Sequence, residues 1–322
     1  MSSVLNLTNG DSSVSIMQRA KIGGEFLPWR DVLHEGPVPG DLSLKALSEL
    51  RAKFISGRGW GEQSAVLQGF VERDAKLASF HKFDEVVLWF EHDLYDQLQI
   101  LQILDWFATQ DLKNTTLSII CTNQYLGLLS AEQMLGLQTY KVPITAPMLS
   151  LASRAWSAFC NSSPVDLCEI LHADLTALPY LHNALLRLLE EYPAVDSGLS
   201  RTALQALRII ATEPLGAHEI FKQNQSMEEG IFMGDSSFRV VLQELVNSDP
   251  ALIHVSNGTQ LDFPRASTQL LSITEIGSDA MHGNKDFLSL SNIDRWIGGV
   301  HLRADNDWRW KAATQQVSRN AN

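Results

Sequence analysis

The feature that most constrains the fold is the segment 85–90, EVVLWF, in which five apolar residues follow one another without polar alternation. A strand of this kind has both faces covered, as in the centre of a parallel sheet with helices on either side. Glu91, His92 and Asp93 come directly after it, and residues 94–108 repeat apolar side chains at helical spacing. The segment therefore predicts a buried strand, a polar strand end and a helix in succession.

The same alternation of strand and helix patterns runs through the first half of the chain. Strands are expected at residues 3–10, 24–29, 85–90, 117–124 and 139–144. We therefore expect an α/β fold in which residues 1–145 form a Rossmann-like domain with a mostly parallel sheet. From Ala146 the pattern is wholly helical, and residues 193–200 mix Pro, Gly, Asp and Ser, so we expect residues 146–196 to be a helical connector.

Residues 197–322 are expected to form a winged-helix-like α+β domain with a Trp-rich tail. Three short helical patterns, at 200–212, 216–224 and 235–247, precede ALIHVSNGTQLDF, where Asn257-Gly258 between two strand-like runs predicts a β-hairpin. Residues 199–265 contain five basic and eight acidic residues, a net charge of −3. Because DNA affinity depends strongly on Lys and Arg, we expect a protein contact or a packing role here, and nucleic acid is not the expected partner.

The charge and cysteine content of the whole chain exclude some classes of protein. The 37 acidic and 25 basic residues leave a net charge of −12, which disfavours non-specific attraction to nucleic acid or to an anionic membrane. The N-terminus has no basic segment followed by an apolar run, and no stretch approaches the roughly 18 apolar residues of a membrane span. The three cysteines predict neither a disulfide framework nor a four-thiolate zinc site. We expect a cytoplasmic protein without a membrane partner, and its oligomeric state stays open.

Several longer strings of the sequence occur in a fixed order between about Leu5 and Trp310. They are NGDSS, PWRDVLHEGPVPG, LWFEHDLYDQLQILQILDWF, FMGDSSF and DRWIGGVHLR. Together they resemble a bacterial family known only as domain of unknown function 1835. The resemblance implies an N-terminal domain that ends near the fifth strand, and a companion C-terminal domain. It implies no substrate, cofactor or catalytic residue, so the chemistry has to come from the residues themselves.

Polar side chains follow four of the expected strands. In an open parallel sheet the loops after the strands gather along one edge, where such folds bind ligands. We take as candidate catalytic residues Asp11, His34, Glu35, Glu91 and His92, and as candidate ligand-binding residues Asn9, Ser12, Arg30, Asp93 and Asn123.

Two chemistries suit this set of residues. Asp and Glu oxygens with His nitrogens are ligands for a divalent metal, which lowers the pKa of a bound water. Alternatively, His34 or His92, paired with a neighbouring carboxylate, acts as a general base without metal. The sequence lacks a recognised metal spacing such as two His four residues apart, which weighs against the metal. The turn after the first strand leads into a helix whose N–H groups suit a phosphate, although the glycine run and the lysine of the known phosphate loops are missing.

Structural alternatives exist for the same residues. Asp93 is placed to cap the helix that begins near Leu94. Glu91 and His92 point to opposite faces while the strand continues, and Glu91 is a candidate partner of Arg30 or Lys82. The loop with His34 and Glu35 suits a structural role as well as a functional one.

The tail adds a second group of candidates. The segment 292–311 holds three tryptophans with Arg295, Arg303 and Arg309, and Asp294, Arg295 and His301 are secondary site candidates. Arg beside Trp suits stacking on a substrate ring, but a hairpin that closes a core is the favoured interpretation.

The leading hypothesis is a protein that binds a small polar or phosphorylated ligand at the strand ends of its N-terminal domain, with hydrolysis as the candidate reaction. The alternative is a noncatalytic regulatory or adaptor protein, which contacts a protein or nucleic-acid partner through the winged-helix-like unit.

Overall fold

The computed structural model describes residues 3–258, 260–265 and 267–319. The chain divides into two compact units, Met1–Leu185 with Gly298–Val300, and Leu186–Ile297 with His301–Asn322. The division falls inside a helix, Leu181–Leu189 (α8). Residues 146–185 belong to the first unit, in which the helix Ala146–Cys160 (α6) packs along the helix Leu94–Ala108 (α4).

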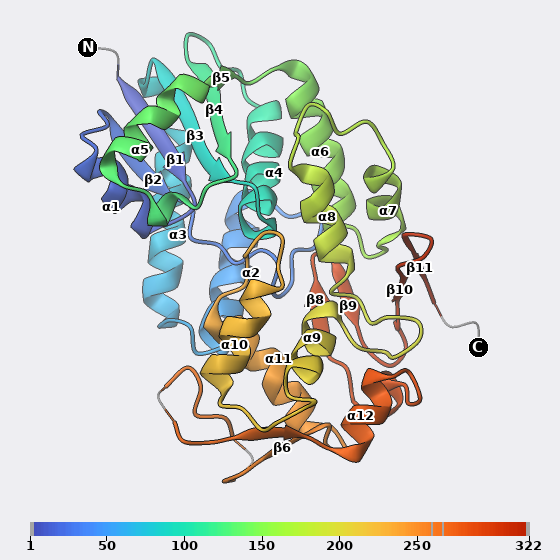
Figure 1. The fold of residues 1–322 in the computed structure, drawn as a ribbon. Coiled ribbons are helices and arrows are strands. Elements are labelled where there is room, and N and C mark those ends of the chain that lie inside the picture. Colours follow the sequence, from blue (N-terminus) through green and yellow to red (C-terminus); the bar gives the residue numbers. More distant parts are fainter. Residues whose placement is uncertain (1–2, 259, 266, 320–322) are drawn as a thin grey trace. The chain divides into compact units, whose positions relative to one another are not determined.

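The first unit is built on a five-stranded sheet in the order β2-β1-β3-β4-β5 (Figure 1). Its strands are β1 (Val4–Thr8), β2 (Glu25–Pro28), β3 (Glu85–Glu91), β4 (Thr116–Thr122) and β5 (Val142–Pro143). The first four strands are parallel, and β5 pairs antiparallel with β4. The expected α/β class and the mostly parallel sheet are therefore confirmed.

The connections that follow β1 and β3 lead toward opposite edges of the sheet. The chain passes from β1 through α1 (Asp11–Arg19) to β2 on one side, and from β3 through α4 to β4 on the other. Since such crossovers are right-handed, α1 and α4 cover opposite faces. Figure 1 shows α1 and α5 (Ala131–Gly136) on one face and α4 on the other.

The sequence of β3 explains its central position. Every residue from Val86 to Glu91 is buried, and alternate side chains face opposite sides of the sheet. Val87 and Trp89 pack with Ile16 and Met17 of α1 in one core cluster. The Trp89 Nε1–H donates to Asn6 Oδ1 across the sheet at 2.9 Å, so the large ring is buried without an unsatisfied donor.

Further helices surround this sheet. In the first unit they are α2 (Leu44–Gly57), α3 (Gln63–Ala78) and α7 (Val165–Leu171), with short 3₁₀ turns at η1 (Phe80–Lys82), η2 (Leu126–Leu128) and η3 (Leu137–Tyr140). Among the described residues, no helix has both the length and the apolar character that a membrane crossing requires.

The second unit begins with three helices and a small antiparallel sheet. The elements are α9 (Arg201–Ile209), α10 (Ala217–Ser226), α11 (Asp235–Asn247), β6 (Ile253–Val255) and β7 (Leu271–Ile273). A single bridge also joins Leu215, which lies between α9 and α10, to Leu271 of β7. The chain continues through α12 (Glu275–Met281), η4 (Phe287–Ser289), β8 (Arg295–Ile297), β9 (Val300–Leu302), β10 (Arg309–Lys311) and β11 (Gln316–Ser318). β8 pairs with β9, and β10 with β11.

The prediction of a hairpin at Asn257-Gly258 is wrong about the second strand. β6 pairs with β7 and not with the run after Gly258, in which residues 260–263 form no strand and Thr259 lies outside the described residues. The physical reason is that Phe263 is buried against the rings of Phe221 and Phe238, so the apolar run packs on helices instead of joining a ladder.

Candidate functional site

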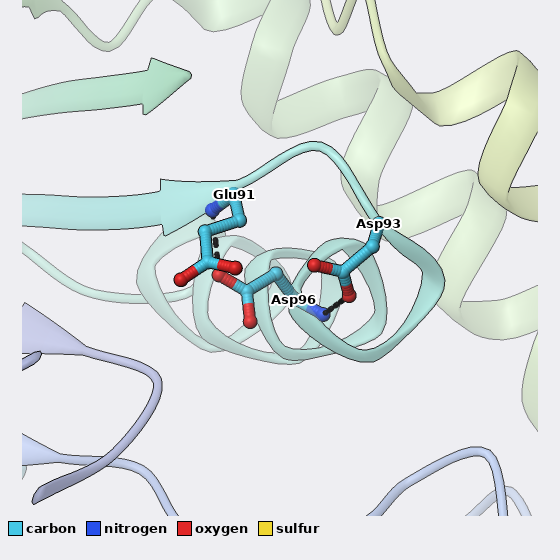
Figure 2. Close-up of side chains that lie close together, drawn as sticks. All are labelled: Glu91, Asp93 and Asp96. Carbon is cyan, nitrogen blue, oxygen red and sulfur yellow. Dashed lines mark hydrogen bonds between the residues drawn. The ribbon is translucent and has the colours of Figure 1, made fainter. Parts of the chain in front are cut away.

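Three carboxyl groups, those of Glu91, Asp93 and Asp96, converge where β3 ends and α4 begins (Figure 2). Each offers one oxygen, and these oxygens all lie within 4.8 Å of one another. The three residues are buried, with exposed fractions of 6%, 5% and 0%. We call Glu91, Asp93 and Asp96 the acidic cluster. Glu91 and Asp93 were expected at this edge of the sheet, whereas Asp96 was not.

The start of α4 positions two of the three acids. Asp93 is the N-cap residue, and its Oδ1 accepts from the Asp96 backbone N–H at 3.2 Å, so the expected cap is confirmed. Asp96 is the third residue of the helix, and its Oδ2 accepts from the Glu91 backbone N–H at 2.5 Å. The first turn of α4 therefore lies directly beside the end of β3. This turn brings the Asp96 carboxyl beside that of Glu91.

The end of β1 supplies a polar side chain to the same place. Asn9 Nδ2 donates to Glu91 Oε1 at 2.9 Å and to both carboxyl oxygens of Asp96 at 3.1 Å. Asn9 Oδ1 accepts from Ser13 Oγ at 2.7 Å, which fixes the orientation of the amide. After β4, the backbone N–H of Leu126 donates to Glu91 Oε1 at 2.8 Å. Three strand ends therefore meet at the cluster, as expected for an edge of a parallel sheet.

Burial raises the pKa of all three acids. It is the largest cause of the raised pKa of Glu91, which the hydrogen bonds from Leu126 and Asn9 partly offset. Burial and the charge of Glu91 raise the pKa of Asp93 to about 7. Burial, with the charges of Asp93 and Glu91, raises the pKa of Asp96 well above its ordinary value. The neighbouring charges that act on Asp93 and Asp96 are thus those of their fellow carboxyls, and each acid of the cluster releases its proton at a higher pH than the same group in water.

His34 and Glu35 lie on a loop that one arginine holds in place. The Arg51 Nε–H donates to Asp31 Oδ1 at 2.9 Å, and its Nη groups donate to the carbonyls of Glu35 at 2.5 Å and Val32 at 2.7 Å. The guanidinium is fully buried. The loop is therefore a rigid element of the first unit. The His34 ring meets the ring of Tyr95 edge to face, with centroids 6.0 Å apart.

Asp11 and Arg30 form an exposed pair instead of joining the acidic cluster. Arg30 donates through Nε to Asp11 Oδ2 at 2.7 Å and through Nη2 to Oδ1 at 2.5 Å, and both side chains are more than half exposed. Arg30 lowers the pKa of Asp11. The Glu91 carboxylate accepts hydrogen bonds from the Asn9 side chain and from the Leu126 backbone N–H. The expected pairing of Glu91 with Arg30 or Lys82 is therefore wrong.

The remaining candidates at this edge are His92, Ser12 and Asn123, which are not among the three clustered acids. His92 is half-buried, and its ring centroid lies 5.4 Å from that of Tyr125 and 6.0 Å from that of Tyr180. Ser12 and Asn123 are exposed. The structure therefore brings together Asn9, Glu91 and Asp93 from the expected set. The spacing Asp93-x-x-Asp96 was the available signal for Asp96, since it puts a second acid one helical turn from the cap.

The secondary candidates belong to the second unit. Asp294 Oδ1 lies 2.5 Å from His301 Nε2, and Arg295 Nη2 lies 3.0 Å from Glu191 Oε2. Asp294 and Arg295 line a cavity of about 490 Å³. Burial acts to raise the pKa of Glu191, but Arg187 and Arg295 outweigh it and lower that pKa to about 2. Arg295 thus takes part in a buried ion-pair network.

No protein-family model matches the chain, and no curated protein matches it. The resemblance to domain of unknown function 1835 therefore stays a prediction.

Proposed function

We propose that the first unit binds a small phosphorylated ligand at the ends of β1 and β3, and hydrolyses it with a divalent cation held by the acidic cluster. The observation that carries this proposal is the convergence of three buried carboxyls within 4.8 Å. Carboxylate oxygens are the ligands that Mg²⁺, Mn²⁺ and Ca²⁺ prefer in proteins.

The position of the cluster supports a ligand site. β1 and β3 are neighbours whose following helices cover opposite faces, and Asn9 and Glu91 stand at the ends of these strands. In doubly wound sheets the point where the strand order reverses opens a crevice that binds ligands, often phosphates. We infer that the sheet is Rossmann-like in this sense, and that the crevice lies over the acidic cluster.

The electrostatics of the cluster favour a cation. Three ionised carboxylates this close repel one another strongly, and burial weakens the screening by water. The charge of Glu91 raises the pKa of Asp93, so a proton on Asp93 relieves the repulsion between the two carboxyls. A divalent cation relieves the same repulsion when it takes the place of that proton. With a pKa of about 7, Asp93 gives up its proton at neutral pH at little cost.

Hydrolysis would draw on the chemistry of the bound ion. Glu91, Asp93 and Asp96 would hold a divalent cation, which would polarise a phosphoryl oxygen and lower the pKa of a bound water so that the water could act as a nucleophile.

The test compares metal binding in two single variants of α4. Asp93→Asn keeps the helix cap but removes the titrating carboxyl. Asp105→Asn is the control, because Asp105 also lies on α4 and has a pKa raised by burial, but is not one of the clustered acids. In thermal unfolding with Mn²⁺, Mg²⁺ or Ca²⁺ at neutral pH, the wild type and Asp105→Asn gain about 2.7 kcal/mol when the metal is at about 100 times its Kd. Asp93→Asn gains much less.

Two results separate the parts of this proposal. If no metal stabilises the wild type, or if Asp105→Asn loses the effect as well, the cation site is refuted. If metal binds but p-nitrophenyl phosphate and its diester are not hydrolysed, the binding part stands and the hydrolase part fails.

A second candidate function rests on the topology of the second unit. We infer that α9, α10, α11 and the β6–β7 sheet, with the Leu215–Leu271 bridge, form a winged-helix-like unit of an adaptor. The helix in the recognition position, α11, carries Asp235 and Glu244 against Arg239. We therefore propose a protein partner and not duplex DNA. Tight, salt-dependent binding of a duplex by the full chain is the outcome that contradicts this choice.

A further inference from the structure

The second unit contains a cavity of about 680 Å³ that the proposals above do not use. Its walls come from the segment 190–196, from α9 and from residues 310–313 of β10 and the turn after it. Small-molecule sites in proteins typically measure about 300 to 1,000 Å³ and are mostly apolar. The size of this cavity therefore suits a small organic ligand.

Apolar side chains form much of the wall. Tyr192 and Leu199 are almost fully buried at its base, with 1% of each residue exposed. Val195 and Met227 also line the cavity, and 42% and 41% of these residues are exposed. Exposed apolar side chains that gather around a hollow indicate a surface that a ligand covers.

Trp310 lines this cavity and carries a buried indole donor. Its backbone N–H donates to the Pro193 carbonyl at 2.8 Å, and its carbonyl accepts from the Val195 N–H at 3.1 Å, so the main chain holds the residue in place. The residue is 4% exposed, and its indole Nε1–H has no hydrogen-bond partner within the described residues. A buried donor without an acceptor is unfavourable. A ligand oxygen that reaches Nε1 supplies a hydrogen bond that the free protein lacks.

The charges around the cavity favour an anion. Arg201 is neutralised by two carboxylates, with Nη1 at 2.8 Å from Glu190 Oε2 and Nη2 at 2.6 Å from Glu229 Oε2. Arg208 and Lys311 are exposed and line the same cavity, against the single further acid Asp196. The residues that line the cavity therefore carry one more positive than negative charge, and the two cations outside the Arg201 ion pairs are Arg208 and Lys311.

We propose that this cavity binds a small amphipathic carboxylate. The apolar body of the ligand packs against Tyr192, Leu199, Val195 and Met227. Its carboxylate is recognised by Arg208, Lys311 and the Trp310 Nε1–H. All the lining residues belong to the second unit, so the proposal is independent of the cation site in the first.

The test uses three probes that share one apolar chain and differ in charge. Octanoate, 1-octanol and octylamine are titrated into the full chain at neutral pH and followed by calorimetry. The proposal expects octanoate to bind best, with an affinity at least about tenfold above that of octylamine. Equal affinities for the three probes, or no binding of octanoate, overturn it.

Single substitutions then locate the site. Lys311→Gln and Arg208→Gln are expected to weaken the binding of octanoate several-fold and to leave the binding of 1-octanol unchanged. Lys222→Gln changes an exposed lysine of α10 outside the cavity and is expected to have no effect on either. Trp310→Phe keeps an aromatic ring but removes the indole N–H donor. It is expected to weaken the binding of octanoate more than the binding of 1-octanol. A loss in Lys222→Gln equal to that in Lys311→Gln refutes the role of these cations.

A cavity-filling variant keeps the test independent of charge. Ala313 is exposed and lines the cavity, so Ala313→Trp is expected to fold normally and to weaken octanoate by at least about tenfold. Circular dichroism checks the fold. Unchanged binding in a folded Ala313→Trp variant shows that octanoate binds elsewhere and overturns the proposal. Asp93→Asn, in the first unit, leaves octanoate binding unchanged.

Discussion

The substitution Asp93→Asn tests the electrostatics of the acidic cluster in the absence of any ligand. Asn is as good an N-cap residue as Asp, so the cap of α4 is kept. The Asn side chain carries no charge beside Glu91, as the protonated Asp93 carboxyl does. The variant is therefore a permanently neutral version of the protonated residue, and its stability differs from that of the wild type only where Asp93 ionises.

The magnitude follows from the pKa of Asp93. Folding raises that pKa from 3.8 to about 7, so between these two values the folded protein binds a proton that the unfolded chain has released. The wild type is therefore progressively destabilised as the pH rises from about 4 to about 7, and at 1.36 kcal/mol for each pH unit the loss reaches about 4 kcal/mol. Asp93→Asn avoids this loss. Its advantage should grow from near zero at about pH 4 to about 4 kcal/mol at about pH 8.

The assay is urea unfolding of both proteins across this pH range. Hydrogen exchange of peptides from β3 and α4 identifies the transition of the first unit. Asp105→Asn serves again as the control on the same helix, and a smaller gain is expected because Asp105 has no clustered acids beside it. The reasoning is refuted if Asp93→Asn is no more stable than the wild type at about pH 8, or if its advantage does not change with pH.

Three further predictions concern the surroundings of the cluster. Asn9→Ala removes the donor that Glu91 and Asp96 share, and is expected to destabilise the first unit by about 1 to 3 kcal/mol in urea unfolding at neutral pH. Arg51→Met leaves the buried carboxylate of Asp31 without its partner, and should reduce the free energy of unfolding by about 3 to 5 kcal/mol. Asp11→Ala breaks only an exposed ion pair, and a change in thermal stability above about 1 kcal/mol is not expected.

The sequence of this protein already determines much of the sheet and the start of the site. The apolar run before Glu91 has no polar face, so it is stable only at the centre of a covered sheet, and that is where β3 lies. Asp93 is recognisable as a cap because it stands directly before a long helical repeat. Asn9 and Glu91 follow strands that run parallel, and this places both at one edge. These features depend on short-range patterns, which a sequence displays directly.

Tertiary structure decided which polar residues meet. Asp11 and Asn9 are two positions apart, yet Asn9 turns toward the acidic cluster while Asp11 turns outward to Arg30. The spacing from Asp93 puts Asp96 one helical turn from the cap, and its contact with the Glu91 N–H in the structure makes it the third acid. In the second unit, the partner of β6 is β7 because Phe263 packs against helices instead. The contacts of Asn9, of Asp11 and between β6 and β7 join separate segments of the chain, and the periodicity of any one segment carries no information about them.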